Sequence, residues 1–139
     1  MIEWQVSNLE LSKQLAKLGS KQESLFWWYS HPESDSFFVE KAGYSSDDGM
    51  SVPICSAFTT AELGEMLPFS IDHKNTFANM KVQPLGVHGK PKIKINWWIK
   101  YVSLGNDETV CEEYADTEAD VRAKMLIYLT KNKRIEILK

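Results

Sequence analysis

The feature that most constrains the fold is an alternation of apolar and polar residues over positions 92–102. A period of two is typical of a β-strand with one buried and one exposed face. The apolar face of the predicted strand consists of Ile93, Ile95, Trp97, Ile99 and Tyr101. The opposite face carries Lys92, Lys94, Asn96, Trp98 and Lys100, and this set is our candidate binding face.

A turn and a second strand are predicted directly after this strand. Residues 104–107 have turn composition, and residues 109–114 are expected to return antiparallel beside the lysine-rich strand. Glu112 and Glu113 then lie near the lysines, in a register that the sequence leaves open. Opposite charges paired across strands contribute a few tenths to about 1 kcal/mol each.

Three segments carry helix signals. Ser7 and Glu10 have the spacing of a capping box, and leucines at helical spacing follow over residues 8–18. Thr59 and Glu62 form a second capping box, which opens a short helix. Thr117 is the predicted N-cap of a last helix that begins with acidic residues.

The remaining segments predict further strands and loops. Bulky apolar residues indicate strands at 25–29, 37–41 and 76–82 and a short closing strand at 135–138, whereas 43–53 has loop composition. The fold class predicted from this order is α+β. We expect a mainly antiparallel sheet of about four to five strands, with two or three helices packed on one face.

Length and composition favour one soluble domain over residues 1–139. A chain of 139 residues, 43% of them hydrophobic, can bury a core without disulfides or a structural metal. No apolar run approaches the roughly 20 residues of a membrane span, and the first residues show no secretory signal. Cys55 and Cys111 form no disulfide framework or metal pair. We therefore expect a cytoplasmic protein without a membrane partner.

The net charge of −3 conceals segregated blocks of charge. Residues 73–106 hold six lysines and no acid, whereas residues 107–121 hold seven acids and no base. Such blocks indicate either elements that pair with each other or surface patches that meet partners.

Three stretches together resemble a known group of proteins. They are residues 11–27, residues 57–68, which read AFTTAELGEMLP, and residues 116–129, which open with DTEAD. The combination resembles small uncharacterised proteins encoded by bacteriophages, prophages and related mobile elements of Gram-positive and gut bacteria. The resemblance implies an accessory protein in the cytoplasm of a bacterial host, and it assigns no catalytic or binding residue.

The candidate binding face admits two interpretations. Lysines around an exposed tryptophan are typical of single-stranded nucleic-acid sites, where lysines hold phosphates and the ring stacks on a base. The alternative is a solvated strand face whose charges are balanced by the acidic return strand. Only Arg122 and Arg134 are arginines, and the pI is about 5.6, so a general nucleic-acid binder is disfavoured.

Two adjacent tryptophan pairs, at 27–28 and 97–98, bear on partners. Consecutive residues of a strand face opposite sides, so one ring of each pair leaves the core unless both faces are covered. Either a helix or a partner subunit covers the second ring, or an aromatic patch is exposed. Exposed aromatic side chains favour protein–protein contact.

No motif indicates catalysis, a metal or a cofactor. His31, His73 and His88 are far apart and lack the spacing of metal ligands. Asp47 and Asp48 lack the closing glutamate of a calcium loop. We therefore expect no catalytic, metal-binding or cofactor-binding residues, although catalytic triads need not be local in sequence.

Three functions remain open at this point. The preferred one is a non-enzymatic accessory protein of phage type that binds another protein or associates with itself as a homodimer. The second is a weak single-stranded nucleic-acid-binding module that uses the candidate binding face. The third is an enzyme of unknown class.

Overall fold

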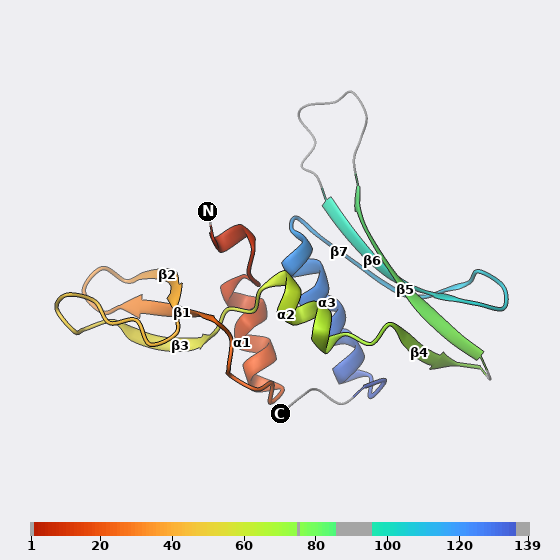
Figure 1. Cartoon of the computed structure of the whole chain (residues 1–139), viewed down its shortest axis with the longest axis horizontal. Coiled ribbons are helices and arrows are strands. Elements are labelled where there is room, and N and C mark those ends of the chain that lie inside the picture. The colour runs from red at the N-terminus through yellow and green to blue at the C-terminus, as the bar shows by residue number, and fades with distance from the viewer. Residues whose placement is uncertain (1, 75, 86–95, 136–139) are drawn as a thin grey trace, which may run out of the picture.

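The computed structural model describes residues 2–74, 76–85 and 96–135 (Figure 1). In this part of the chain, three α-helices combine with two antiparallel sheets, which confirms the predicted α+β class. The helices are α1 (Leu9–Lys17), α2 (Thr60–Met66) and α3 (Glu118–Lys131), preceded by a 3₁₀ turn, η1 (Ile2–Trp4). The strands are β1 (Phe26–His31), β2 (Ser36–Lys41), β3 (Val52–Ser56), β4 (Ser70–His73), β5 (Thr76–Leu85), β6 (Asn96–Ser103) and β7 (Thr109–Ala115).

The strands form two sheets, where the sequence analysis expected one. The three-stranded sheet has the order β2-β1-β3, and the four-stranded sheet has the order β4-β5-β6-β7. Figure 1 shows the helices between the two sheets. Two strands were not predicted. Strand β3 lies in the segment expected to be a loop, and its Pro53 is tolerated because β3 is an edge strand.

The main core lies between α3 and the inner face of the four-stranded sheet. Ile99 and Tyr101 of β6 are fully buried there, as the alternation in the sequence predicts. Helix α3 also contacts α1 and α2, so its buried residues lie on several sides of the helix. Its buried residues are Ala119, Val121, Ala123, Met125, Leu126, Ile127 and Leu129.

Two of the three predicted helix starts are confirmed. Thr59 and Glu62 form the capping box of α2, and Thr117 is the N-cap of α3. The helix predicted over residues 8–18 is present as α1, but the predicted cap is wrong. The N-cap is Asn8, whose side chain accepts from the backbone N–H of Leu11 at 2.9 Å.

Ser7 has a tertiary role in place of the predicted cap. Its side chain is buried, with Oγ 2.7 Å from Ser12 Oγ, and it accepts from the backbone N–H of Phe58 at 3.2 Å. Phe58 comes from the segment before α2, so a local sequence pattern does not reveal this contact.

A second, smaller core supports the three-stranded sheet. It consists of Val6, Val39 and Ala57, and Trp28 packs against it. The Trp28 Nε1–H also donates to the carbonyl of Ser7 at 3.0 Å, which satisfies the indole where it is partly buried.

The predicted closing strand is only partly tested. Ile135 lies in a bend and packs against the main core, and residues 136–138 lie outside the described residues. Within the described residues, no helix is both long and apolar enough to span a membrane.

Candidate functional site

The four-stranded sheet has one face that no helix of the described residues covers. All three helices lie on the same side of this sheet in Figure 1, and the antiparallel register determines which side chains point away from them. We call the opposite side the outer face. Its side chains are Ser70 and Asp72 of β4; Phe77, Asn79, Lys81 and Gln83 of β5; Trp98, Lys100 and Val102 of β6; and Glu112 and Tyr114 of β7.

The candidate binding face of the sequence analysis falls partly on the outer face. Trp98 and Lys100 lie there, opposite to the buried Ile99 and Tyr101. Asn96 begins β6, and its side chain is not among those described. Lys92 and Lys94 lie outside the described residues. The part of the prediction that the structure describes therefore rests on Trp98 and Lys100.

Lys100 is engaged on two sides. Its Nζ lies 4.8 Å from the centroid of the Trp98 ring and 3.6 Å from Oε2 of Glu112. Glu112 is also its direct partner in the register between β6 and β7. The predicted pairing of the lysine-rich strand with the acidic return strand is thus confirmed at this position. A phosphate approaching Lys100 has to compete with a carboxylate that is already in place.

Aromatic side chains from three strands share the outer face. Tyr114 stands directly opposite Trp98 and is 43% exposed, whereas Trp98 is partly buried. Phe77 on β5 is 54% exposed. Exposed aromatic side chains without a covering element are typical of recognition surfaces.

The outer face also carries an uncompensated cation. Lys81 on β5 is the register partner of Lys100, is exposed, and forms no ion pair with any residue that the structure describes. The candidate face predicted from the sequence did not include Lys81, Phe77 or Tyr114. The signal for β5 was an alternation in which the buried Ala78 separates Phe77 from Asn79.

The two tryptophan pairs differ in their surroundings. Trp97 packs against the main core, and Trp98 lies under Lys100 on the outer face. Trp28 packs against the smaller core, and Trp27 is partly buried. Protein contacts therefore shield part of each ring, and the exposed aromatic area of the outer face comes mainly from Tyr114 and Phe77.

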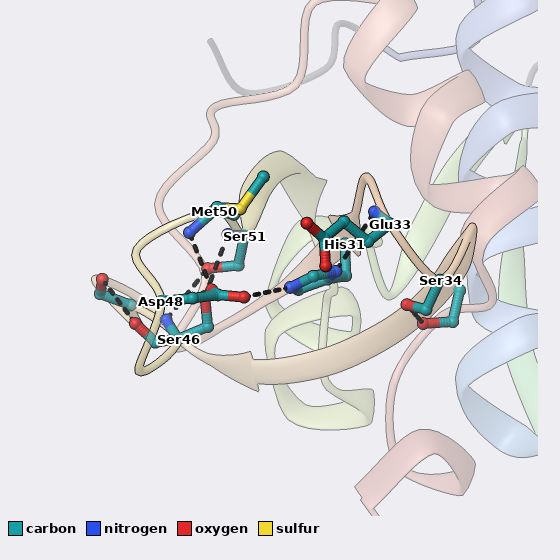
Figure 2. Close-up of polar contacts among 9 residues, drawn as sticks. His31, Glu33, Ser34, Ser46, Asp48, Met50 and Ser51 are labelled. Carbon is teal, nitrogen blue, oxygen red and sulfur yellow. Dashed lines mark hydrogen bonds and ion pairs between the residues drawn. The ribbon is translucent and has the colours of Figure 1, made fainter.

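His31 and Asp48 form the most tightly bonded polar pair among the ionisable residues described (Figure 2). The Nε2 of His31 lies 2.8 Å from Oδ2 of Asp48, and the backbone N–H of Glu33 donates to His31 Nδ1 at 3.3 Å. A nitrogen that accepts from Glu33 leaves Nε2 as the donor to Asp48 in the neutral ring. Both nitrogens are occupied, so the pair links the end of β1 to the loop before β3 and has no free lone pair for a general base.

Asp48 organises the loop that precedes β3. Its Oδ1 accepts from Ser46 Oγ at 2.6 Å and from the backbone N–H of Met50 at 3.0 Å. These hydrogen bonds, the one from Ser46 first, and the bond with His31 hold the pKa of Asp48 well below its usual value. The loop is therefore closed around a carboxylate that stays ionised.

The cysteines have the surroundings of structural thiols. Cys55 is buried in β3, and Cys111 is partly buried with its Sγ 3.8 Å from Sδ of Met125. Burial is the main cause that raises the pKa of both thiols, which disfavours the nucleophilic thiolate. Among the described residues, no group of three or more His, Cys, Asp or Glu side chains is placed to hold a metal ion.

Comparison with known proteins leaves the geometry as the guide to function. No protein-family model, curated protein or solved structure matches this chain.

Proposed function

We propose that this protein is a non-enzymatic binding protein that holds a protein partner on the outer face of its four-stranded sheet. The observation that carries the proposal is a sheet face, not covered by any described helix, that exposes Tyr114 next to Trp98 and exposes Phe77 near the other end of β5. Burial of aromatic side chains is the largest source of affinity in protein interfaces. The resemblance to phage-encoded accessory proteins is part of the same proposal, with the partner in a bacterial host.

Charge indicates the chemistry of the partner. Lys81 and Lys100 lie side by side on the two central strands, and of the two only Lys100 has an ion pair within the described residues. The partner therefore presents carboxylates together with apolar side chains. Complementary charge of this kind raises the association rate and selects the orientation of the complex.

The test is capture from a bacterial host lysate with matched variants. Tyr114→Ala and Lys81→Glu each alter the outer face, and Phe37→Ala removes an equally exposed aromatic from the other sheet. We expect one partner to be enriched by the wild type and by Phe37→Ala, and to be lost with both outer-face variants. Equal enrichment by all four proteins would contradict the proposal.

Sedimentation velocity of the pure protein identifies a second copy of the chain as the occupant. Dimer formation that disappears in Tyr114→Ala and Lys81→Glu would show that the outer face pairs with itself. A monomer at all concentrations, together with selective capture, would show that the partner is a different protein.

Single-stranded nucleic acid is the second candidate, favoured by one observation. Trp98 and Tyr114 are direct neighbours across β6 and β7, with Lys81 one row away on the same face. Stacked bases contribute about 1–3 kcal/mol each on such rings. The bond between Lys100 and Glu112 makes this candidate weaker than the first.

Fluorescence anisotropy with labelled single-stranded DNA and RNA tests the second candidate at low and physiological salt. If it holds, Trp98→Ala and Lys81→Glu both weaken binding, and added salt weakens it steeply. Failure to bind at micromolar protein, or binding that neither variant changes, rejects it.

A further inference from the structure

An open surface cavity of about 490 Å³ lies at the turn between β4 and β5, beside the chain that leaves α3. Its volume falls within the usual range of small-molecule sites. The residues that line it are Asp72, His73, Lys74, Thr76, Phe77 and Arg134. The lining therefore combines two cations, a carboxylate, an imidazole, a hydroxyl and an aromatic ring.

Two cations border the cavity without an acidic partner among the described residues. Arg134 is held in place because its Nη1–H donates to the carbonyl of Asp72 at 2.8 Å and its backbone N–H donates to the carbonyl of Leu129 at 2.8 Å. A guanidinium has five N–H donors, so most of them stay available to a ligand. Lys74 adds an ammonium at a turn residue with φ of 43°. Paired Arg and Lys side chains are suited to phosphate oxygens.

The other lining side chains select against a bare anion. The carboxylate of Asp72 repels inorganic phosphate, but it accepts hydrogen bonds from hydroxyl groups, as acidic residues do with ribose in nucleotide sites. The Thr76 hydroxyl supplies a further donor or acceptor. The Phe77 ring is 54% exposed and offers a stacking surface.

His73 forms an inner wall of the cavity. Its side chain is only 12% exposed, and Nε2 has no hydrogen-bond partner among the described residues. That nitrogen lies 3.8 Å from Oε2 of Glu108, in the turn between β6 and β7. The imidazole therefore lies near a carboxylate that does not line the cavity, and Lys74 and Arg134 are the lining cations considered for a ligand.

We propose that this cavity binds a phosphomonoester that carries hydroxyl groups and an aromatic ring, the chemistry of a nucleoside monophosphate. The phosphate lies between Arg134 and Lys74, the sugar hydroxyls meet Asp72, and the base stacks on Phe77. This site shares Asp72 and Phe77 with the outer face, whereas Lys74 and Arg134, which would hold the phosphate, lie outside that face.

Isothermal titration with three probes tests the site: AMP, adenosine and inorganic phosphate. AMP combines all the recognised groups, so we expect it to bind at least about tenfold more tightly than either of the other two. AMP that binds no better than adenosine would remove the role of the cations. AMP that binds no better than phosphate would remove the role of the ring.

Variants assign the binding to this cavity. Lys74→Gly relieves the left-handed backbone and keeps the fold, so a loss of AMP affinity reports the missing charge. We expect Arg134→Lys to weaken AMP binding about tenfold, and Phe77→Leu to weaken AMP binding while leaving phosphate binding unchanged. Lys131→Gln, an exposed cation of α3 that does not line the cavity, is the control. AMP affinity that is unchanged by all three cavity variants, or reduced as much by Lys131→Gln, overturns the proposal.

Discussion

At the scale of single residues, Glu62 serves both a helix and the tertiary structure. Its Oε1 accepts from the backbone N–H of Thr59 at 2.8 Å, which closes the capping box of α2. The same oxygen accepts from Ser24 Oγ at 2.8 Å, and Oε2 accepts from the backbone N–H of Leu25 at 3.2 Å. One carboxylate therefore joins the start of α2 to the chain that enters β1.

We expect Glu62→Ala to lower the free energy of unfolding by about 2 kcal/mol, because the side-chain half of the capping box is lost and the donors from Thr59, Ser24 and Leu25 lose their acceptor. Chemical denaturation measures the change. Glu65→Ala, on the exposed side of the same helix, is the matched control and changes stability by less than about 0.5 kcal/mol. Equal effects of the two substitutions would show that the hydrogen bonds of Glu62 do not contribute to the free energy of unfolding.

Asp48 should make the stability of the folded protein depend on pH in the acidic range. Its pKa is lowered in the folded protein by hydrogen bonds from Ser46, Met50 and His31. A lowered carboxyl pKa contributes stability that is complete above the unfolded value of about 4 and is lost as the pH falls toward the folded value. Thermal unfolding between pH 2 and pH 7 should therefore show a steeper acid loss in the wild type than in Asp48→Asn. Parallel pH profiles would contradict this role.

Ser7 shows where prediction at the residue scale stops. Ser7 and Glu10 have the same spacing as Thr59 and Glu62, yet only the second pair caps a helix. The difference is a tertiary contact of Ser7. The Ser7 hydroxyl accepts from the backbone N–H of Phe58 in the interior, and Asn8 caps α1 in its place. The residues of a helix cap are neighbours in sequence, whereas the donor that competes for the Ser7 hydroxyl is 51 residues away.

At the scale of elements, β6 was predictable and β3 and β4 were not. Strand β6 is buried on one face and solvated on the other, so its sequence alternates. Strand β4 has four residues, and β3 contains Pro53 and stands at a sheet edge. Short edge strands take their structure from a neighbour that is distant in sequence, so they carry little periodic signal of their own.

The pairing of β6 with β7 includes an ion pair between Lys100 and Glu112, whose energy can be measured. In a double-mutant cycle with Lys100→Ala and Glu112→Ala, we expect a coupling energy below about 1 kcal/mol, because both side chains are partly exposed. The coupling should shrink as salt is added. A coupling of zero at low salt would show that the 3.6 Å contact is not maintained in solution.

The whole molecule has two cores of unequal size. The main core surrounds α3, whereas the three-stranded sheet rests on Val6, Val39 and Ala57 together with a few partly buried side chains. Local stability follows the amount of buried apolar contact. The three-stranded sheet should therefore open more readily than α3 and the four-stranded sheet.

Hydrogen exchange measures this difference. We expect the backbone amides of α3 to exchange slowest and Val39→Ala to accelerate exchange only in β1, β2 and β3. Met125→Ala, in the main core, should lower protection throughout and cost about 2–5 kcal/mol. Loss of protection in α3 upon Val39→Ala would instead show that both cores unfold as one unit.

The sequence by itself determined the α+β class, the two faces of β6 and the caps of α2 and α3, because those signals reside in neighbouring residues. Only the tertiary structure decided that the strands form two sheets and that Lys81, Tyr114 and Phe77 share the outer face with Trp98. Register, burial and cavities depend on residues far apart in the chain. Pairing between distant strands therefore placed these side chains on one exposed face of the sheet.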